Sequence, residues 1–179
     1  MSSEIALFTF PEQEQAMVED YLKYQVAYDD LIKGLNADLK IRWEETFIEF
    51  LVAQHEVYRD SMNLLVFKQQ GIPIAFLCYS EENEKIFVSY VFVDLAHRRR
   101  SIGRSLFDCL QRLHPAKSQH LICPRRQGAA EVFYPTLGFQ RDPEGQLAKS
   151  LWFMKPPCPE VNDDLPRKYR LSPQGHRLD

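Results

Sequence analysis

Four arginines lie within ten residues of the sequence, in the segment HRRRSIGRSL at 97–106. Arginine side chains are planar, permanently charged donors that can pair with phosphate through two hydrogen bonds. One glycine and two serines interrupt the arginines, and such small residues let an anion approach the backbone. A β-rich apolar run, KIFVSYVFVDL at 85–95, precedes the segment. The segment is therefore a candidate phosphate-binding turn, and the alternatives are a nucleic-acid contact and a solvated helix face.

A helix that begins near Ser101 favours the phosphate interpretation. Its first backbone N–H groups have no partner within the helix, and the aligned peptide dipoles place a partial positive charge at this end. The preceding strand should end at Val93 or Leu95, facing those N–H groups. Gly103 lets a diphosphate reach the backbone. The pattern is neither GxxxxGK[ST] nor GxGxxG, so we predict a diphosphate cradle of a different kind.

The charge balance argues against a nucleic-acid partner. The 179 residues include 22 Lys and Arg and 25 Asp and Glu, a net charge of −3, and the pI is near 6.0. A dedicated nucleic-acid binder usually has a pI above about 9, and exposed aromatics do not alternate with these arginines. The charge is uneven, because residues 1–60 hold 13 acidic and 5 basic side chains.

Length and composition fit one soluble domain. The sequence is 45% hydrophobic and 26% charged, and no apolar run approaches the roughly 20 residues that span a bilayer. The first ten residues lack the pattern of a secretory signal. We therefore expect a cytoplasmic protein without a membrane partner. No CxxC pair or nearby histidine ligand accompanies any of the four cysteines, so we expect no metal site and no disulfide framework.

The first third predicts one strand and two helices. EIALFTF at 4–10 alternates in the manner of a strand. Thr9 and Glu12 have the spacing of a capping box, so a helix should begin there, and its apolar face recurs at steps of four and three over 17–35. The second helix is RWEETFIEFLVAQH at 42–55. Its apolar face is formed by Trp43, Phe47, Phe50 and Leu51.

The rest of the sequence predicts an antiparallel meander followed by alternating helices and strands. Three β-rich runs, separated by turn-like QQG and EENE, lie at 63–70, 72–80 and 85–95. The later elements are a helix at 101–114, a strand at 119–123, a short helix ending near Gly138 and a strand at 147–155. A strand that leads through a helix to another strand implies a parallel crossover in a mixed sheet.

Two segments resemble the acyl-CoA-binding motifs of the GNAT superfamily of N-acetyltransferases. VDLAHRRRSIGRSL resembles V-x-P-x-x-[QR]-x-x-G-x-[GA], with Val93, Arg98 and Gly103 as matches. Leu95 replaces the proline, and Ser101 replaces the first glycine. QGAAEVFYPTLGF resembles N-x-x-A-x-x-x-Y-x-x-x-G-F, in which Gln127 replaces the asparagine. The agreeing residues of this second motif are Ala130, Tyr134, Gly138 and Phe139.

The resemblance implies an α/β GNAT fold, with a mixed, mostly antiparallel central sheet flanked by helices and an acyl-CoA cleft between central strands. It implies a single domain at 1–155, after which 156–179 would form a C-terminal arm rich in proline and charge. The implied reaction is direct transfer of an acetyl group from acetyl-CoA to a primary amine.

The resemblance also implies which residues bind the cofactor. Backbone groups of the strand before the turn would pair with pantetheine, which points to Val91, Phe92 and Val93. The turn and the helix start would hold the diphosphate through Arg98, Arg99, Arg100, Ser101, Ile102, Gly103, Arg104 and Ser105. Gln127 and Tyr134 belong to the second motif. A tyrosine at the position of Tyr134 would protonate the departing thiolate, as a phenol with a pKa of about 10 can do; its alternative role is packing.

The general base is left open. The acceptor amine must lose a proton, because a lysine-like amine has a pKa near 10.4. Some GNAT members carry an acid on the strand before the turn, but this strand has none between Glu84 and Asp94. His97 lies beside the arginines, and we expect it to be a phosphate-side or packing residue rather than the base. The remaining candidates are Glu82, Glu84, Asp94, Glu44, Glu45, Glu49 and a water relay through Ser89 or Tyr90.

The sequence says less about the acceptor amine and about the oligomeric state than about the cofactor. The acidic first third suggests a cationic small molecule or peptide amine, although the same acids would also serve solubility alone. The alternative function is an acyl-CoA-binding regulatory module with weak catalysis, because the strand acid and one motif glycine are missing. The arm at 156–179 is compatible with a homodimer contact, a partner-binding tail or disorder.

Overall fold

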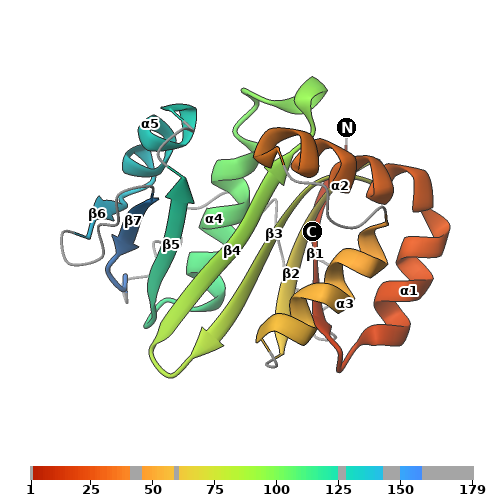
Figure 1. The fold of residues 1–179 in the computed structure, drawn as a ribbon, viewed down its shortest axis with the longest axis horizontal. Helices are drawn as coiled ribbons and strands as arrows, with labels where there is room; N and C mark the ends of the chain where they lie inside the picture. The colour runs from red at the N-terminus through yellow and green to blue at the C-terminus, as the bar shows by residue number, and fades with distance from the viewer. Residues whose placement is uncertain (1, 41–45, 59–60, 125–127, 143–149, 159–179) are drawn as a thin grey trace.

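The computed structural model describes residues 2–40, 46–58, 61–124, 128–142 and 150–158. They form a seven-stranded sheet in the order β1-β2-β3-β4-β5-β7-β6 (Figure 1). The strands are β1 Ser3–Phe10, β2 Met62–Gln69, β3 Ile72–Glu82, β4 Lys85–Val93, β5 Ser118–Pro124, β6 Gln140–Arg141 and β7 Ser150–Lys155. The helices are α1 Glu14–Lys23, α2 Gln25–Leu39, α3 Phe47–Tyr58, α4 Ile102–Leu113 and α5 Gly128–Thr136.

The sheet is mixed and mostly antiparallel, as predicted. Strands β1 to β4 pair antiparallel in sequence order, and β7 pairs antiparallel with both β5 and β6. The parallel pair is β4 with β5, in which Lys85 lies opposite Ser118 and Val88 opposite Leu121. Helix α4 connects these two strands, which confirms the predicted parallel crossover.

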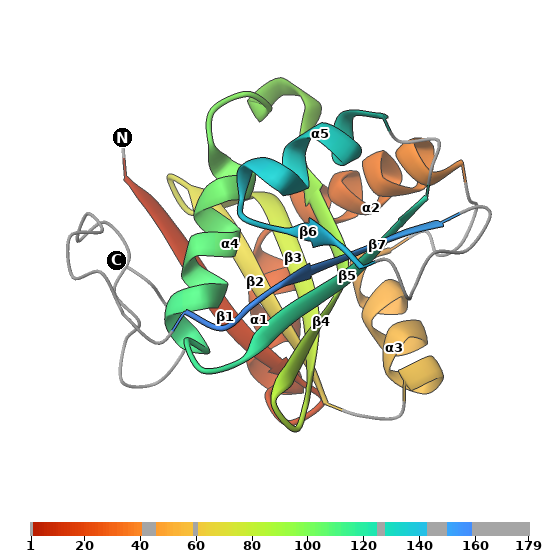
Figure 2. The ribbon, with the colours of Figure 1, turned by 90° about the vertical axis from the view of Figure 1, so that its left-hand side faces the viewer.

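Helices cover the sheet on both faces, with α1, α2 and α3 on one side and α4 and α5 on the other (Figures 1 and 2). Alternate residues of β2 contribute to the two cores. Leu64 and Val66 join the core under α1, α2 and α3, whereas Leu65 and Phe67 join the core under α4 and α5. The continuous apolar run in β2 is therefore that of a strand buried on both faces.

The single helix predicted through 17–35 is wrong, because the chain forms α1 and α2 with a break at Tyr24. Hydrogen bonds between side chains join the two helices across this corner. The Tyr21 hydroxyl donates to Asp29 Oδ1 at 2.9 Å, and the Tyr28 hydroxyl donates to Asp20. The apolar spacing continues through the break, so periodicity alone does not reveal it.

The helix start also differs from the predicted capping box. Thr9 remains in β1, and α1 begins at Glu14. The reciprocal partner of Thr9 is Gln13 rather than Glu12. The Thr9 N–H donates to Gln13 Oε1 at 2.8 Å, and the Gln13 N–H donates to the Thr9 carbonyl at 2.7 Å. Glu12 instead accepts a hydrogen bond from Ser61.

The other predicted elements are present with shifted ends, and the predicted starts of the 42–55 helix and the 147–155 strand lie outside the described residues. Phe47, Phe50 and Leu51 are buried on α3, while Trp43 lies outside the described residues. The two-residue strand β6 and a short 3-10 turn at Leu95–His97 were not predicted, because both are too short to show a periodic pattern. No helix in the described part of the chain is long and apolar enough to cross a membrane.

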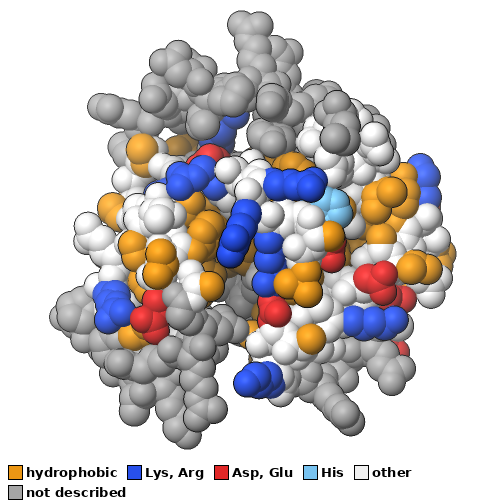
Figure 3. Space-filling model, turned by 90° about the horizontal axis from the view of Figure 1, so that it is seen from above, with side chains coloured by type: hydrophobic (Ala, Val, Ile, Leu, Met, Phe, Trp, Pro, Cys, Tyr) orange, Lys and Arg blue, Asp and Glu red, His pale blue; other side chains and the backbone are white. Residues whose placement is uncertain are grey.

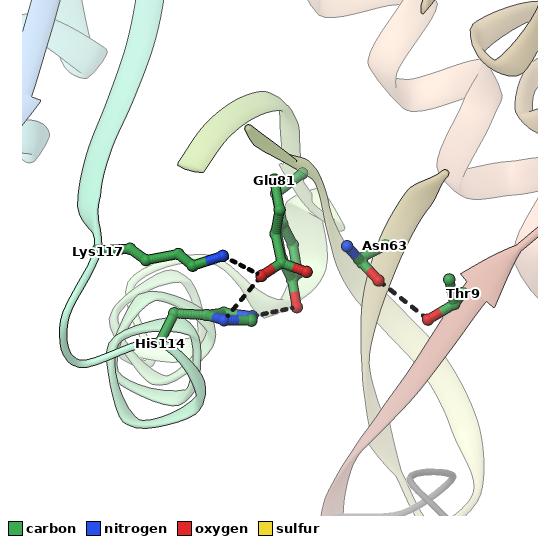
Figure 4. A network of polar contacts seen from close by, with 6 residues as sticks. Thr9, Asn63, Glu81, His114 and Lys117 are labelled. Carbon is green, nitrogen blue, oxygen red and sulfur yellow. Dashed lines mark hydrogen bonds and ion pairs between the residues drawn. The ribbon is translucent and has the colours of Figure 1, made fainter. Parts of the chain in front are cut away.

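A polar cluster fastens the end of the sheet opposite the start of α4 (Figure 4). Glu81, near the end of β3, pairs with Lys117 Nζ at 2.7 Å and lies 3.2 Å from His114 Nδ1. His114 Nε2 lies 3.0 Å from the buried Tyr79 hydroxyl. Burial lowers the pKa of His114, although Glu81 opposes that shift. The cluster connects β3 to the end of α4 and to the segment that enters β5.

Candidate active site

Strands β4 and β5 pair along only the first part of β4. Strand β5 pairs with Lys85–Val88, whereas β3 remains paired with β4 as far as Val93. Cys78 lies opposite Tyr90 and Tyr79 opposite Val88, so Ser89 is an extra residue on β4. Such a β-bulge bends a strand and changes the direction of its backbone groups. Beyond the bulge, the described residues of β5 leave one edge of β4 available to a ligand.

The predicted strand residues Val91, Phe92 and Val93 lie along this part of β4. Val91 and Val93 are half-buried against the core under α4 and α5, and Phe92 is buried on the opposite face. Their side chains are therefore committed to packing. Any ligand between β4 and β5 would meet their backbone groups, as in the addition of a strand to a sheet edge.

The turn after β4 contains two residues in left-handed backbone conformations. Arg99 and Ser101 both adopt left-handed conformations, with φ of 63° and 61°. Ser101 stands where the motif has its first glycine, and glycine adopts this conformation without the steric cost of a Cβ. For serine the cost is about 1 kcal/mol. The substitution thus changes the residue type while preserving the turn.

The turn leads directly into the N-terminus of α4. The Ser105 N–H donates to the Ser101 carbonyl at 3.0 Å, so the N–H groups of Ile102, Gly103 and Arg104 precede the first bond of the helix. Together with the helix dipole, these groups can hold an anion. Gly103 also has a packing role that the sequence did not suggest. A Cβ at this position would lie 3.1 Å from Cζ of Phe133 in α5.

The arginines of the turn point in different directions. Arg98 Nη2 lies 2.5 Å from Asp38 Oδ2 in α2, whereas Arg104 Nη2 donates to the Thr136 carbonyl at 3.4 Å. Arg99 and Arg100 are exposed. Figure 3 views this end of the molecule and shows basic side chains gathered near the middle of the face. The turn therefore brings the predicted residues together, but the guanidinium of Arg98 is engaged with α2.

Tyr134 lies in α5 within a group of aromatic rings. The centre of its ring is 5.4 to 5.9 Å from the centres of four neighbouring rings, those of Phe107, Phe133, Phe139 and Phe153. Burial raises the pKa of the Tyr134 phenol well above its ordinary value. The hydroxyl therefore stays protonated at neutral pH, as a proton donor must. The packing fixes the ring and does not conflict with a catalytic role for the hydroxyl.

The end of α5 explains the glycine of the second motif. Gly138 has a φ of 92°, a left-handed conformation that commonly terminates helices. The Phe139 N–H donates to the Tyr134 carbonyl at 3.2 Å. This turn directs Phe139 into the core beside Tyr134. Gln127, which precedes the helix, lies outside the described residues.

The candidates for the general base occupy different parts of the fold. Glu84 precedes Ser89 by five residues and Asp94 follows it by five, which places each roughly 16 Å along the strand from the bulge. Asp94 Oδ2 lies 2.8 Å from His97 Nδ1 in the turn. Glu82 lies in the same hairpin as Glu84.

Ser89 and Tyr90 lie at the bulge itself. The Ser89 hydroxyl donates to the Cys78 carbonyl at 3.3 Å, and the Tyr90 ring contacts Phe50 with ring centres 5.2 Å apart. Glu49 is at the start of α3, where its N–H bonds Thr46. Glu44 and Glu45 lie outside the described residues. Among the described candidates, Ser89 and Tyr90 are therefore the two that lie at the bulge.

Several acids of the first third already have partners within the protein. Asp20 pairs with the buried Lys68 at 2.6 Å, and Asp29 accepts a hydrogen bond from the Phe47 N–H at 3.0 Å. Asp38 pairs with Arg98. The charges of Asp20 and Asp38 are therefore largely balanced by Lys68 and Arg98, whereas the hydrogen bonds of Asp29 come from neutral donors. The two balanced charges weaken the argument that the first third attracts a cationic acceptor.

Two of the described cysteines, Cys78 and Cys109, are not suited to nucleophilic chemistry. Cys78 and Cys109 are buried, and burial raises the pKa of the Cys109 thiol to about 12. A thiol with so high a pKa is almost entirely protonated at neutral pH. Within the described ranges, no group of three His, Cys, Asp or Glu side chains could hold a metal ion.

Comparisons with known proteins agree with this arrangement. A family model described as an acetyltransferase (GNAT) domain matches residues 14–155, and a search of curated proteins finds no match. The PaiA N-acetyltransferase from Thermoplasma acidophilum, solved in complex with coenzyme A, is 15% identical with a TM-score of 0.63. The match covers 87% of this chain and 99% of that chain.

Two further solved structures match over similar lengths. An acetyltransferase from Streptococcus agalactiae is 13% identical, with a TM-score of 0.60 and coverage of 84% of this chain and 97% of that one. An acetyltransferase from Thermus thermophilus is 14% identical, with a TM-score of 0.59 and coverage of 87% and 97%. At these identities the likeness establishes a shared fold.

Proposed function

This chain belongs to the GNAT acetyltransferase family, and on that premise we propose that it transfers the acetyl group of acetyl-CoA directly to a primary amine. The observation that carries the proposal is the continuity of two binding elements. The part of β4 beyond Ser89, with which the described residues of β5 do not pair, leads through the turn into the N-terminus of α4. An extended chain that ends in a diphosphate fits that path.

The cofactor would be bound mainly through the backbone. Amide groups of pantetheine would pair with Val91, Phe92 and Val93 as an added strand pairs with a sheet edge. The diphosphate would accept hydrogen bonds from the first N–H groups of α4. Arg99 and Arg100 would add positive charge from exposed positions, since neither requires movement of a packed side chain.

The proposed reaction is an acyl transfer in which the amine attacks the carbonyl carbon of the thioester. A carbon–nitrogen bond forms and the carbon–sulfur bond breaks, with its electron pair leaving on sulfur. The Tyr134 phenol would donate a proton to that thiolate. The ammonium acceptor would lose its proton to water beside Ser89 and Tyr90. Holding the two reactants together would supply much of the rate enhancement.

The nature of the acceptor is the least constrained part of the proposal. The acids that are paired with Lys68 and Arg98 contribute little net attraction for a cation. The exposed acids Glu14 and Glu19 of α1 still make the first third negative. A panel of polyamines, peptide amines and uncharged amines tests whether turnover follows acceptor charge. Equal rates across the panel would contradict the proposed preference for cationic acceptors but not the proposed acetyl transfer.

Binding and turnover must be measured separately to test this function. Purified protein is titrated with acetyl-CoA by calorimetry, and release of the CoA thiol is then followed with and without the amine panel. We expect binding together with amine-dependent thiol release. Binding without thiol release would favour the regulatory module that lacks catalysis, and an absence of binding would contradict both functions.

A further inference from the structure

Arg98 contacts both the end of β4 and the end of α2. Its Nη2 lies 2.5 Å from Asp38 Oδ2, in the last turn of α2. Its Nε donates to the carbonyl of Val93, the last residue of β4, at 2.9 Å. The guanidinium carbon also lies 5.2 Å from the centre of the Phe92 ring. Three contacts thus define the position of one exposed side chain.

Helix α2 is shaped to receive Phe92 beside this arginine. Gly34 lies in the interior of α2, where glycine lowers helix stability relative to alanine. A Cβ at Gly34 would clash with the Phe92 ring, because Cε1 would lie only 2.9 Å away. Gly34 and Asp38 are four residues apart and therefore share a face of the helix. That face contacts Phe92 through Gly34 and Arg98 through Asp38.

These contacts join the two sides of the proposed active site. The start of α4, where the diphosphate would bind, lies on one face of the sheet with α5. Helices α2 and α3 cover the other face (Figures 1 and 2). With the thioester between β4 and β5, α4 and α5 would block approach from their own face. The acceptor would therefore approach beside α2 and α3.

We propose that Arg98 and Asp38 form a positioning pair that fixes the acceptor-side helix α2 against the cofactor-binding strand β4, so that Arg98 is not a phosphate ligand. This proposal rests on the proposed transferase function. A diphosphate that bound Nη2 would have to displace Asp38, and Nε is already bonded to the Val93 carbonyl. The pair is partly exposed, and such pairs contribute little by charge alone. The pair acts by fixing the position of α2, because Val93 and Phe92 already orient the Arg98 side chain that Asp38 contacts.

The two roles of Arg98 predict different effects on the two substrates. If the pair positions α2, Arg98→Gln and Asp38→Asn both lower kcat/KM for the amine on the order of tenfold. The Kd for CoA then stays within about twofold in both variants, and the double variant is no worse than either single variant. Asp38→Glu restores most of the activity. If Arg98 is a phosphate ligand, only Arg98→Gln weakens CoA binding.

Asp30→Asn is the matched control, because it removes the same charge from an exposed site in the same helix. Asp30 lies 3.8 Å from Lys33 and contacts neither Phe92 nor Arg98 in the described structure. Its kinetics should equal those of the wild type. Asp38→Asn behaving like Asp30→Asn would overturn the proposal, as would selective loss of CoA affinity in Arg98→Gln.

Hydrogen exchange separates this proposal from the function on which it rests. Amides at 34–39 should exchange faster in Arg98→Gln and Asp38→Asn than in the wild type, with no change in Asp30→Asn. A wild-type protein that releases no thiol would overturn the proposed function, and exchange would then test the fixing of α2 by itself. Unchanged exchange in both variants would show that the pair does not hold α2.

Discussion

Replacement of Tyr134 by phenylalanine separates the proposed chemistry from the packing around it. The change removes one oxygen and leaves the ring in contact with its four aromatic neighbours. Because burial raises the pKa of this phenol, the wild-type hydroxyl is protonated throughout the neutral range. The Tyr134→Phe variant lacks the proton donor at every pH, so a more acidic buffer should not restore its turnover.

The expected loss is large for turnover and small for binding. A positioned general acid contributes about 10² to 10⁴ in rate, which corresponds to about 3 to 5 kcal/mol in the activation free energy. The affinity for CoA should change by less than about twofold, because the proposed binding groups are backbone groups of β4 and α4. The free energy of unfolding should change little, whereas loss of the whole ring in Tyr134→Ala would cost about 3 to 5 kcal/mol.

The assay combines calorimetric titration with CoA, thiol release with saturating substrates, and unfolding in urea. Tyr24→Phe is the control, since it removes a hydroxyl at the corner between α1 and α2, away from β4. We expect wild-type kinetics from Tyr24→Phe. Turnover by Tyr134→Phe at the wild-type rate would refute the role of Tyr134 as proton donor. Equal losses of turnover and CoA affinity would show instead that the hydroxyl acts in binding.

Three further predictions concern stability. Gly34→Ala should lower the free energy of unfolding by about 1 kcal/mol in urea, because the overpacking of Phe92 exceeds the gain in helix propensity; greater stability would show that the ring moves freely. Ser101→Gly should raise the free energy of unfolding by about 0.5 kcal/mol, since glycine removes the cost of the left-handed conformation but adds freedom to the unfolded chain. A decrease in that free energy of more than about 1 kcal/mol would contradict this. Burial lowers the pKa of His114, so the unfolded chain binds a proton first and stability should fall as the pH drops through about 6.5. Urea unfolding between pH 7.5 and 5.5 should show a smaller fall in His114→Gln than in the wild type, and equal falls would assign the effect to other groups.

The strands and the turn after β4 could be predicted because their signals are local. The runs in β2, β3 and β4 are too rich in β-branched and aromatic residues, and too short, for helices. The segment around Gly103 carried both the charge and the spacing of a phosphate-binding turn. The turn's left-handed residues explain why a glycine is usual at the position of Ser101, and why the fold persists with serine there.

The features missed by the sequence analysis depend on contacts between distant segments. Arg98 meets Asp38 across 60 residues of sequence, so the motif alone suggested a phosphate ligand. An unexplained glycine inside an apolar helix, followed four residues later by an acid, was the available signal. The break at Tyr24 had no such signal, because hydrogen bonds across the corner hold two helices whose apolar spacing is continuous.

The bulge at Ser89 was also not predictable from residue types. Serine in a strand is ordinary, and the bulge is defined by the register with β3. The bulge lies next to Val88, the last residue of β4 that pairs with the described part of β5. The sequence therefore left the general base open among several acids and a water relay, because the spacing of those residues from the bulge was not visible in it.

The most direct test of the proposed function follows the acetyl group itself. The protein is incubated with acetyl-CoA labelled in the acetyl group and with the amine panel, and the products are identified by mass spectrometry. We predict that the label appears on the amine in an amount equal to the free CoA thiol, with no lasting label on the protein. Tight binding of CoA without labelled amine, or label that stays on the protein, would contradict direct transfer.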